Sequence, residues 1–225
     1  MSDRITVEAL SLDLVDTDGA IREADAATAG DTRADLFRKA AIGGGSLIGG
    51  GILLNGLTAP ALAARPSKKQ DVKILNYALT LEYLEAAFYS EAVSKGAISG
   101  DALEAAKIVR DHELAHVKAL KSVLGKAAVK KPKFDFMNTT GDQSTFLATA
   151  VALEDTGVAA YAGQGPRVSQ KAVVQAALSI HSVEARHAAH FRSLAGMTFA
   201  PKAFDAPKSM KQVLKIVTKT GFIQG

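Results

Sequence analysis

The segments 113-ELAH-116 and 184-EARH-187 each place a glutamate three residues before a histidine. With nine Glu and five His in 225 residues, chance alone predicts about 0.2 occurrences of this spacing. Residues three apart share one face of an α-helix, so each segment presents a carboxylate and an imidazole to a common point. The two segments therefore predict two helices that contribute equivalent polar groups to one site.

Two further segments, 81-LEYLEAAFY-89 and 153-LEDTGVAAY-161, repeat one another in the same way. Their offset is 72 residues, against 71 for the Glu-x-x-His pairs. In both, a tyrosine follows the glutamate of a Leu-Glu pair by seven residues, which gives Glu82 with Tyr89 and Glu154 with Tyr161. The chain duplicates chemistry as well as hydrophobicity, which indicates two related halves.

Glu85 competes with Glu82 because both lie on nearly the same helix face. Glu82 is followed by the tyrosine, and its spacing of 31 residues to Glu113 is close to the 30 between Glu154 and Glu184. Glu82 is therefore the expected ligand, and Glu85 is an alternative or additional carboxylate.

Four glutamates in a helical core would bury four negative charges, and each costs several kcal/mol without compensation. Two divalent metal ions would cancel that charge, and two neutral imidazoles would complete their coordination. Carboxylate and imidazole ligands suit iron or manganese, and zinc less specifically. The chain has no cysteine, which excludes thiolate sites, iron–sulfur clusters and a rubredoxin-type electron relay.

Helical periodicity fills the chain from residue 70 onward, and no segment shows the alternation typical of a strand. Asp101 and Asp142 are the expected N-caps of the second and third helices. The connection between those two helices is long, whereas the other two are short. An all-α fold follows: a four-helix bundle with one long crossover, plus a short C-terminal helix. The expected helices span residues 71–95, 101–125, 143–162, 169–196 and 207–219.

The ligand set and connectivity resemble the ferritin-like di-iron carboxylate superfamily. Residues 70–222 look most similar to bacterial exported ferritin-like domain proteins, the group that includes desiccation-related proteins. The resemblance implies that the two Glu-x-x-His glutamates bridge a pair of metal ions. One ion would be held by Glu82, Glu113 and His116, and the other by Glu154, Glu184 and His187. Tyr89 and Tyr161 look like hydrogen-bond donors to carboxylates across the bundle, with simple core packing as the alternative.

The remaining polar residues near these motifs carry weaker expectations. Ferritins often have an Asp directly before Glu-x-x-His that orients the opposite histidine, but His112 and Val183 stand there in this chain. His112 is expected to point away from the site. The candidates for the orienting role are Asp111 and Asp155, and the candidates for accessory roles are His181 and His190.

The leading functional hypothesis is a di-metal oxidoreductase of ferroxidase or peroxidase type. It would bind two iron ions, or manganese, and react with dioxygen or hydrogen peroxide. One alternative is a manganese catalase-like enzyme. Another is a non-catalytic stress or desiccation-related protein that metals stabilise. A ferritin-type storage cage is disfavoured, and the sequence leaves a homo-oligomer open.

The N-terminal part of the chain differs from the body in charge. Residues 1–63 carry five Lys and Arg against nine Asp and Glu, whereas residues 64–225 carry 22 against 14. The lysines of the body are scattered, so no nucleic-acid partner is expected. Residues 64–225 form the expected bundle domain.

Residues 1–39 are predicted to be a disordered acidic leader. Its segment 32-TRADLFR-38 resembles a degenerate twin-arginine box in which Ala34 replaces the second arginine. The uncharged segment 40–63 ends in Ala-Leu-Ala, as an export signal does. The protein is therefore expected to be exported to the periplasm, cell envelope or medium. A retained membrane anchor is the alternative.

Overall fold

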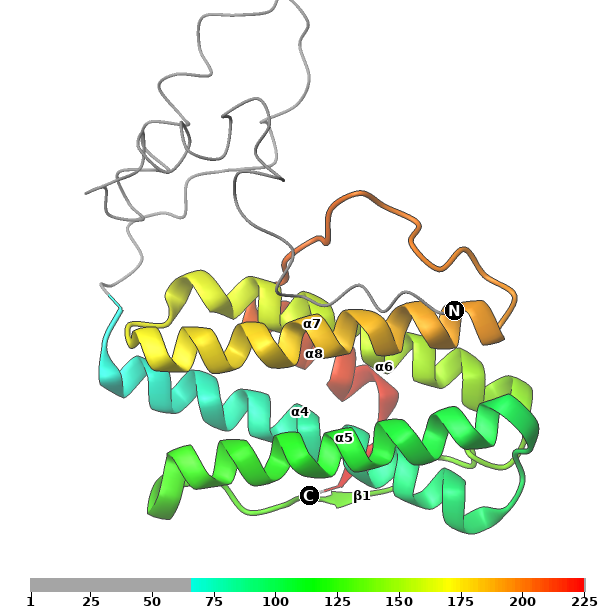
Figure 1. Ribbon diagram of the computed structural model, residues 1–225. Coiled ribbons are helices and arrows are strands. Elements are labelled where there is room, and N and C mark those ends of the chain that lie inside the picture. Colours follow the sequence, from blue (N-terminus) through cyan, green and yellow to red (C-terminus); the bar gives the residue numbers. More distant parts are fainter. Residues whose placement is uncertain (1–65, 225) are drawn as a thin grey trace, which may run out of the picture. The chain divides into compact units, whose positions relative to one another are not determined.

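The computed structural model describes residues 66–224. Short connections join the first helix to the second and the third to the fourth, and residues 125–142 cross over between the two pairs (Figure 1). In this view α5 (Gly100–Leu124) and α7 (Lys171–Leu194) lie in front of α4 (Lys68–Lys95) and α6 (Gln143–Gln164). The predicted bundle with one crossover and a short C-terminal helix is confirmed. The C-terminal helix is α8 (Met210–Thr220). Two 3₁₀ turns, η2 (Gly125–Ala127) and η3 (Gly165–Arg167), follow α5 and α6.

The crossover contains a two-residue strand that the sequence pattern did not predict. β1 (Lys133–Phe134) pairs antiparallel with β2 (Ile223–Gln224) near the C-terminus. Two residues are too few to leave an alternating pattern in the sequence. Just beyond the pair, Phe136 and Phe222 are buried and meet edge to face with centroids 5.4 Å apart. The strands therefore fix the crossover to the end of the chain.

The N-cap prediction holds for α6 and fails for α5. The Asp142 carboxylate accepts a hydrogen bond from the Thr145 N–H at 2.9 Å. At α5 the cap is Ser99, and Asp101 lies in the first turn. The Ser99 N–H donates to Gln143 Oε1 at 3.0 Å, which ties the turn before α5 to the start of α6.

Gly163 lies inside α6, one residue beyond the predicted end of the third helix. A Cβ at this position would lie 1.9 Å from the carbonyl oxygen of Lys208. The Lys208 N–H donates to the carbonyl of Ala159 at 3.0 Å. This glycine therefore serves a close approach between the segment that precedes α8 and α6.

Asp71 fixes the start of α7 from within the first turn of α4. Its buried carboxylate accepts hydrogen bonds from the backbone N–H groups of Ser169 at 2.8 Å and Gln170 at 3.1 Å. The side chains of both residues also donate to it. One carboxylate thus holds together elements that are 98 residues apart in sequence.

The C-terminal helix α8 packs on the bundle. Val213 and Val217 are buried in the same apolar cluster as the core residues of α4 and α6. A capping box between Ser209 and Gln212 fixes its first turn. Leu214 and Ile216 remain partly exposed on the outer side.

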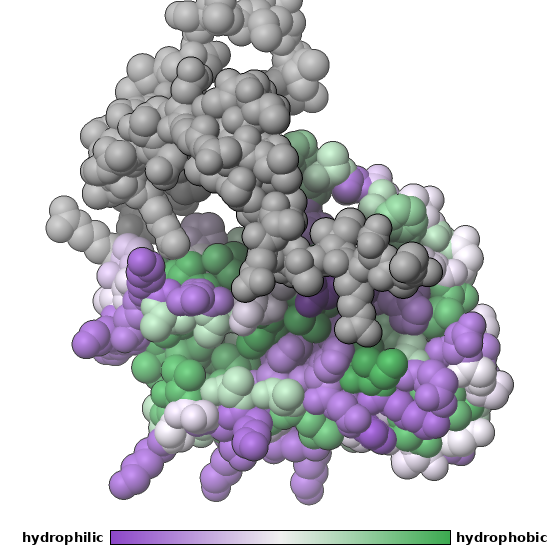
Figure 2. All heavy atoms as spheres, viewed as in Figure 1, coloured by the Kyte–Doolittle hydropathy of each residue, from purple (hydrophilic) through white to green (hydrophobic). Residues whose placement is uncertain are grey.

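Hydrophilic and hydrophobic residues alternate over the visible face of the bundle, and hydrophilic side chains project along the edge where α5 runs (Figure 2). Within residues 66–224, no helix is both long enough and apolar enough to cross a bilayer. The predicted leader, residues 1–39, and the predicted signal or anchor, residues 40–63, lie outside the described residues.

Candidate metal centre

Each of the four long helices contributes one glutamate with no solvent exposure. They are Glu82 on α4, Glu113 on α5, Glu154 on α6 and Glu184 on α7. The two histidines stand one turn after the glutamates of α5 and α7. The side chain of His116 is 12% exposed and that of His187 is 6% exposed. The structure thus brings all six sequence-predicted residues into the middle of the bundle.

Both histidines direct Nδ1 at the carboxylates. His116 Nδ1 lies 3.2 Å from oxygens of Glu82, Glu113 and Glu184. His187 Nδ1 lies 3.2 Å from Glu113 Oε1 and 3.3 Å from Glu154 Oε2. Each imidazole therefore reaches carboxylates from both halves of the chain.

The residues form two overlapping groups of four. Within each group, the possible ligand atoms all lie within 4.8 Å of one another. Glu113 and Glu184 belong to both groups. The first group adds Glu82 and His116, and the second adds Glu154 and His187. Such sharing is the geometry that two neighbouring cations with bridging carboxylates require.

Two tyrosines donate hydrogen bonds to Glu82 and Glu154, the glutamates that belong to only one group each; these two are called the outer carboxylates. The Tyr161 hydroxyl on α6 donates to Glu82 Oε1 on α4 at 2.5 Å, and the Tyr89 hydroxyl on α4 donates to Glu154 Oε1 on α6. Burial and the nearby carboxylate charges raise the pKa of both hydroxyls well above its usual range. Both tyrosines therefore stay protonated and act as donors.

Glu85 is also buried, and it occupies space that a glycine provides. Glu85 and Gly157 follow Glu82 and Glu154 by three residues each, so they are equivalent positions of the two halves. A Cβ on Gly157 would lie 3.2 Å from Glu85 Oε1 and 3.0 Å from Glu184 Oε2. Burial and the charge of Glu184 raise the pKa of Glu85 well above its ordinary value. The buried cluster thus contains a fifth carboxyl group, and it comes from the first half of the chain only.

In the absence of metal, the pKa values of the cluster indicate that it retains protons. Burial and the charge of Glu82 raise the pKa of Glu113, and burial and the charge of Glu113 raise that of Glu184. Burial also disfavours charge on Glu82, but hydrogen bonds, chiefly from His116, hold its pKa below the usual value. Burial opposes charge on His116, yet the carboxylates of Glu113, Glu184 and Glu82 around its Nδ1 raise its pKa to about 12. A cation bound here would displace these protons.

Several of these buried atoms have no hydrogen-bond partner among residues 66–224. They are Glu113 Oε1, Glu154 Oε2, both oxygens of Glu184 and His187 Nδ1. His187 Nδ1 lies close to Glu113 and Glu154, but without hydrogen-bond alignment. Buried polar atoms are nearly always paired, so the convergence of unpaired oxygens and an imidazole nitrogen fits a cation. The donor types suit iron or manganese.

The expectation that His112 points away from the site was wrong. Its Nδ1 lies 2.9 Å from Nε2 of His187, and the two rings are stacked. His187 can donate from Nε2 while its Nδ1 faces the carboxylates. His112 therefore occupies the orienting role on the opposite histidine, and the sequence signal was its position directly before Glu113.

The other candidates for an orienting role do not contact the histidines. Asp111 forms an ion pair with Arg110, and Asp155 accepts hydrogen bonds from Nε and Nη2 of Arg192. At the position equivalent to His112, Val183 offers no polar group to His116. The two halves of the centre are thus unequal.

A cleft of about 620 Å³ reaches the centre from the surface between α5 and α7. Its lining includes the imidazoles of His112, His116, His187 and His190. His190 is exposed, whereas His181 does not line the cleft. The cleft gives small solutes access to the histidine side of the centre.

Comparisons with known proteins agree with the fold. A family model described as the ferritin-like domain matches residues 70–197. Among solved structures, the crystal structure of a hypothetical protein from Methanococcus jannaschii matches with a TM-score of 0.51 and 14% identity, over 70% of this chain and 97% of that chain. This likeness concerns the fold alone. No curated protein matches the chain.

Proposed function

This chain belongs to the ferritin-like domain family, and we propose that its buried centre binds two iron or manganese ions that react with dioxygen or hydrogen peroxide. The observation that carries the proposal is the set of four fully buried glutamates whose unpaired oxygens converge with two imidazoles. Burial of that much negative charge is tolerable only with cations or protons among the carboxylates.

The roles of the residues follow from the two overlapping groups. Glu113 and Glu184 would bridge the ions, and Glu82 with His116 and Glu154 with His187 would each complete one coordination sphere. The metals supply one-electron redox chemistry toward the oxidant. Tyr89 and Tyr161 hold the outer carboxylates in orientation, and His112 fixes the ring of His187. Glu85 is an additional carboxylate that can hold a proton beside the centre.

Turnover by the reconstituted protein tests this proposal. Metal-free protein is loaded anaerobically with Fe²⁺, and oxidation is followed in the near ultraviolet after addition of air or hydrogen peroxide. We expect oxidation well above the rate of free Fe²⁺, and loss of that excess in Glu113→Ala and His187→Ala. Lys107→Ala, in an exposed ion pair with Glu104 on α5, is the matched control.

The alternatives give different results in the same experiment. Peroxide dismutation by manganese-loaded protein alone would identify a manganese catalase-like enzyme. Metal binding that raises the melting temperature without turnover of Fe²⁺ or peroxide would identify a non-catalytic, metal-stabilised protein. Either result would refute the ferroxidase or peroxidase assignment while preserving the metal centre.

We also propose that the N-terminal part of the chain directs export, because a basic flank, an uncharged apolar segment and a small-residue exit occur in that order. Amino-terminal sequencing of the protein from a bacterial expression host tests it. A mature N-terminus just after Ala63 in the exported fraction supports the proposal, and an intact N-terminus on protein confined to the cytoplasm contradicts it.

A further inference from the structure

A cavity of about 150 Å³ lies at the end of the bundle where α4 and α7 begin and α5 and α6 end. All four long helices line it. Apart from Tyr77, Tyr161 and Gln164, its lining consists of aliphatic side chains and one glycine. The cavity stands next to the metal centre, because Ala78 and Leu120 in its lining lie one helical turn from Glu82 and His116. None of the six candidate ligands lines the cavity.

Two polar groups in the cavity wall have no partner among residues 66–224. They are the hydroxyl of Tyr77 and the amide nitrogen of Gln164. These residues are only 8% and 4% exposed. Burial, with a contribution from the charge of Glu85, raises the pKa of Tyr77, so its hydroxyl remains protonated. Buried donors of this kind are almost always paired in folded proteins, so they indicate a ligand that brings an oxygen.

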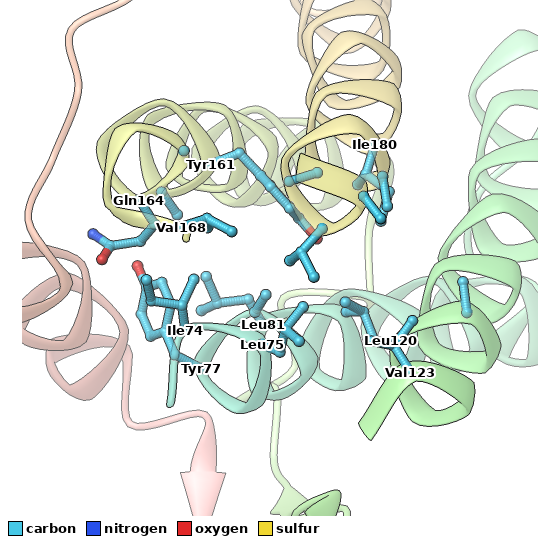
Figure 3. A pocket seen from close by; sticks show the side chains of 18 residues that line it. Ile74, Leu75, Tyr77, Leu81, Leu120, Val123, Tyr161, Gln164, Val168 and Ile180 are labelled. Carbon is cyan, nitrogen blue, oxygen red and sulfur yellow. The ribbon is translucent and has the colours of Figure 1, made fainter. Parts of the chain in front are cut away.

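The two polar residues lie together on one side of the cavity, where Ile74 and Val168 also line it. Figure 3 shows Tyr77 and Gln164 on the side of α4 and α6, and Leu120, Val123 and Ile180 on the side of α5 and α7. A ligand that enters from the α5–α7 side would therefore reach the polar pair with its far end.

The α5–α7 side is also where the cavity opens. The small residues Ala119 on α5, and Ala172 and Ala176 on α7, line it and are exposed. Figure 2 shows hydrophobic residues gathered on the left of the visible face. The C-terminal end of α5 and the N-terminal end of α7 lie on that side in Figure 1. Small side chains at the opening leave a passage that a flat molecule can use.

The volume and lining select the size and type of the ligand. An apolar cavity of about 150 Å³ accommodates one benzene ring. The rings of Tyr77 and Tyr161 in the wall favour an aromatic molecule, which also loses little conformational freedom on binding. The oxygen of one hydroxyl on that ring can accept from both Gln164 Nε2 and the Tyr77 hydroxyl.

We propose that this cavity is a binding site for a monocyclic phenol, which inserts its ring between α5 and α7 and places its hydroxyl between Tyr77 and Gln164. The site needs no bound metal, so it stands apart from the proposed redox function. The ring would lie beside Tyr161, whose hydroxyl contacts Glu82.

Titration of the full chain with phenol, followed by the methyl NMR signals of Val173 and Ile180, tests the proposal in the metal-free and metal-loaded protein. We expect saturable shifts of these signals, with phenol bound about 2–10-fold more tightly than benzene because of the added hydrogen bonds. Ala176→Phe should abolish the shifts by closing the opening. Gln175→Phe, at the neighbouring exposed position, should leave them unchanged.

The head-group variants test the polar end separately. Tyr77→Phe and Gln164→Leu should each remove most of the preference for phenol over benzene while benzene still binds. Tyr83→Phe, a buried tyrosine of α4 that does not line the cavity, is the control. The proposal is overturned if phenol leaves the methyl signals unmoved, if Ala176→Phe still binds it, or if hexan-1-ol binds more tightly than phenol.

Discussion

At Gly157 the absence of a side chain makes room for two carboxyl groups. A Cβ there would lie 3.0 Å from Glu184 Oε2 and 3.2 Å from Glu85 Oε1. Alanine at a helical glycine usually stabilises the helix by about 1 kcal/mol, so the metal-free protein should not lose stability. The same methyl group should displace Glu184 and weaken metal binding.

We therefore predict that Gly157→Ala lowers metal affinity by about tenfold or more while the melting temperature of the metal-free protein is unchanged or raised. Calorimetric titration with Mn²⁺ and thermal unfolding measure the two quantities. The double variant Glu85→Gly with Gly157→Glu moves the fifth carboxyl group to the equivalent position in the second half of the chain. It should bind metal more tightly than Gly157→Ala does. Unchanged affinity in Gly157→Ala would contradict the crowding argument.

His112 acts on the centre through another residue. Its Nδ1 contacts Nε2 of His187, and partners of metal-bound histidines typically contribute 10–100-fold to metal affinity. We predict a loss of that size in His112→Ala for the ion held with His187, measured by metal titration. His190→Ala removes an exposed histidine of the same cleft and should have no effect. Equal losses in both variants would show that the cleft, not the contact, matters.

Among the secondary-structure elements, the junction of α4 and α7 depends on Asp71. Four hydrogen bonds reach its buried carboxylate, and they hold its pKa below the usual value despite the opposing effect of burial. A depressed pKa means that the carboxylate stabilises the fold above its unfolded pKa. That stabilisation is lost as the pH falls through the folded value.

We predict that Asp71→Asn lowers the free energy of unfolding by about 1.5–3 kcal/mol at neutral pH, and that the difference from the unsubstituted protein shrinks below about pH 4. Urea unfolding at several pH values measures both effects. Asp101→Asn changes an exposed aspartate in the first turn of α5 and serves as the control. A difference that is independent of pH would refute the role of the charge.

The long helices and their order were predictable because amphipathic periodicity extends over 20 or more residues. Details set by contacts between distant segments were not. Glycine usually weakens a helix, so the sequence favours a helix end near Gly163. In the structure, however, the close approach of the Lys208 backbone requires a glycine at this position inside α6. The pairing of β1 with β2 joins residues about 90 apart and leaves no local signal.

The same limit applies to the site. Duplicated spacing identified the six residues that the structure brings together. The contact of His112 with His187 depends on how α5 faces α7, which the sequence alone does not encode locally. The distinct environments of Glu85 and Gly157 likewise emerge only when the two halves are superposed in the bundle.

For the whole molecule, the carboxylate cluster predicts an unusual dependence of stability on pH. The pKa values of Glu85, Glu113 and Glu184 are raised from 4.5, and that of His116 is raised from 6.5 to about 12. Groups with raised pKa values stabilise the fold below their unfolded pKa and lose that effect as the pH rises through the folded value.

Metal-free protein should therefore lose stability between about pH 5 and pH 8, by about 1.4 kcal/mol per pH unit for each proton that only the folded state retains. Metal-loaded protein should become more stable over the same range, because bound cations replace these protons. Thermal unfolding with and without a chelator measures both slopes. A flat profile for the metal-free protein would contradict the proton-retaining cluster.

The number of metal ions bound per folded chain tests the central claim most directly. Anaerobic titration of metal-free protein with Fe²⁺ or Mn²⁺, followed by elemental analysis after desalting, should give two ions per chain. Because Glu113 and Glu184 are shared by both groups, Glu113→Gln or Glu184→Gln should reduce the count below two. A count of one or none in the unsubstituted protein, or two in both variants, would contradict a dinuclear centre among these glutamates.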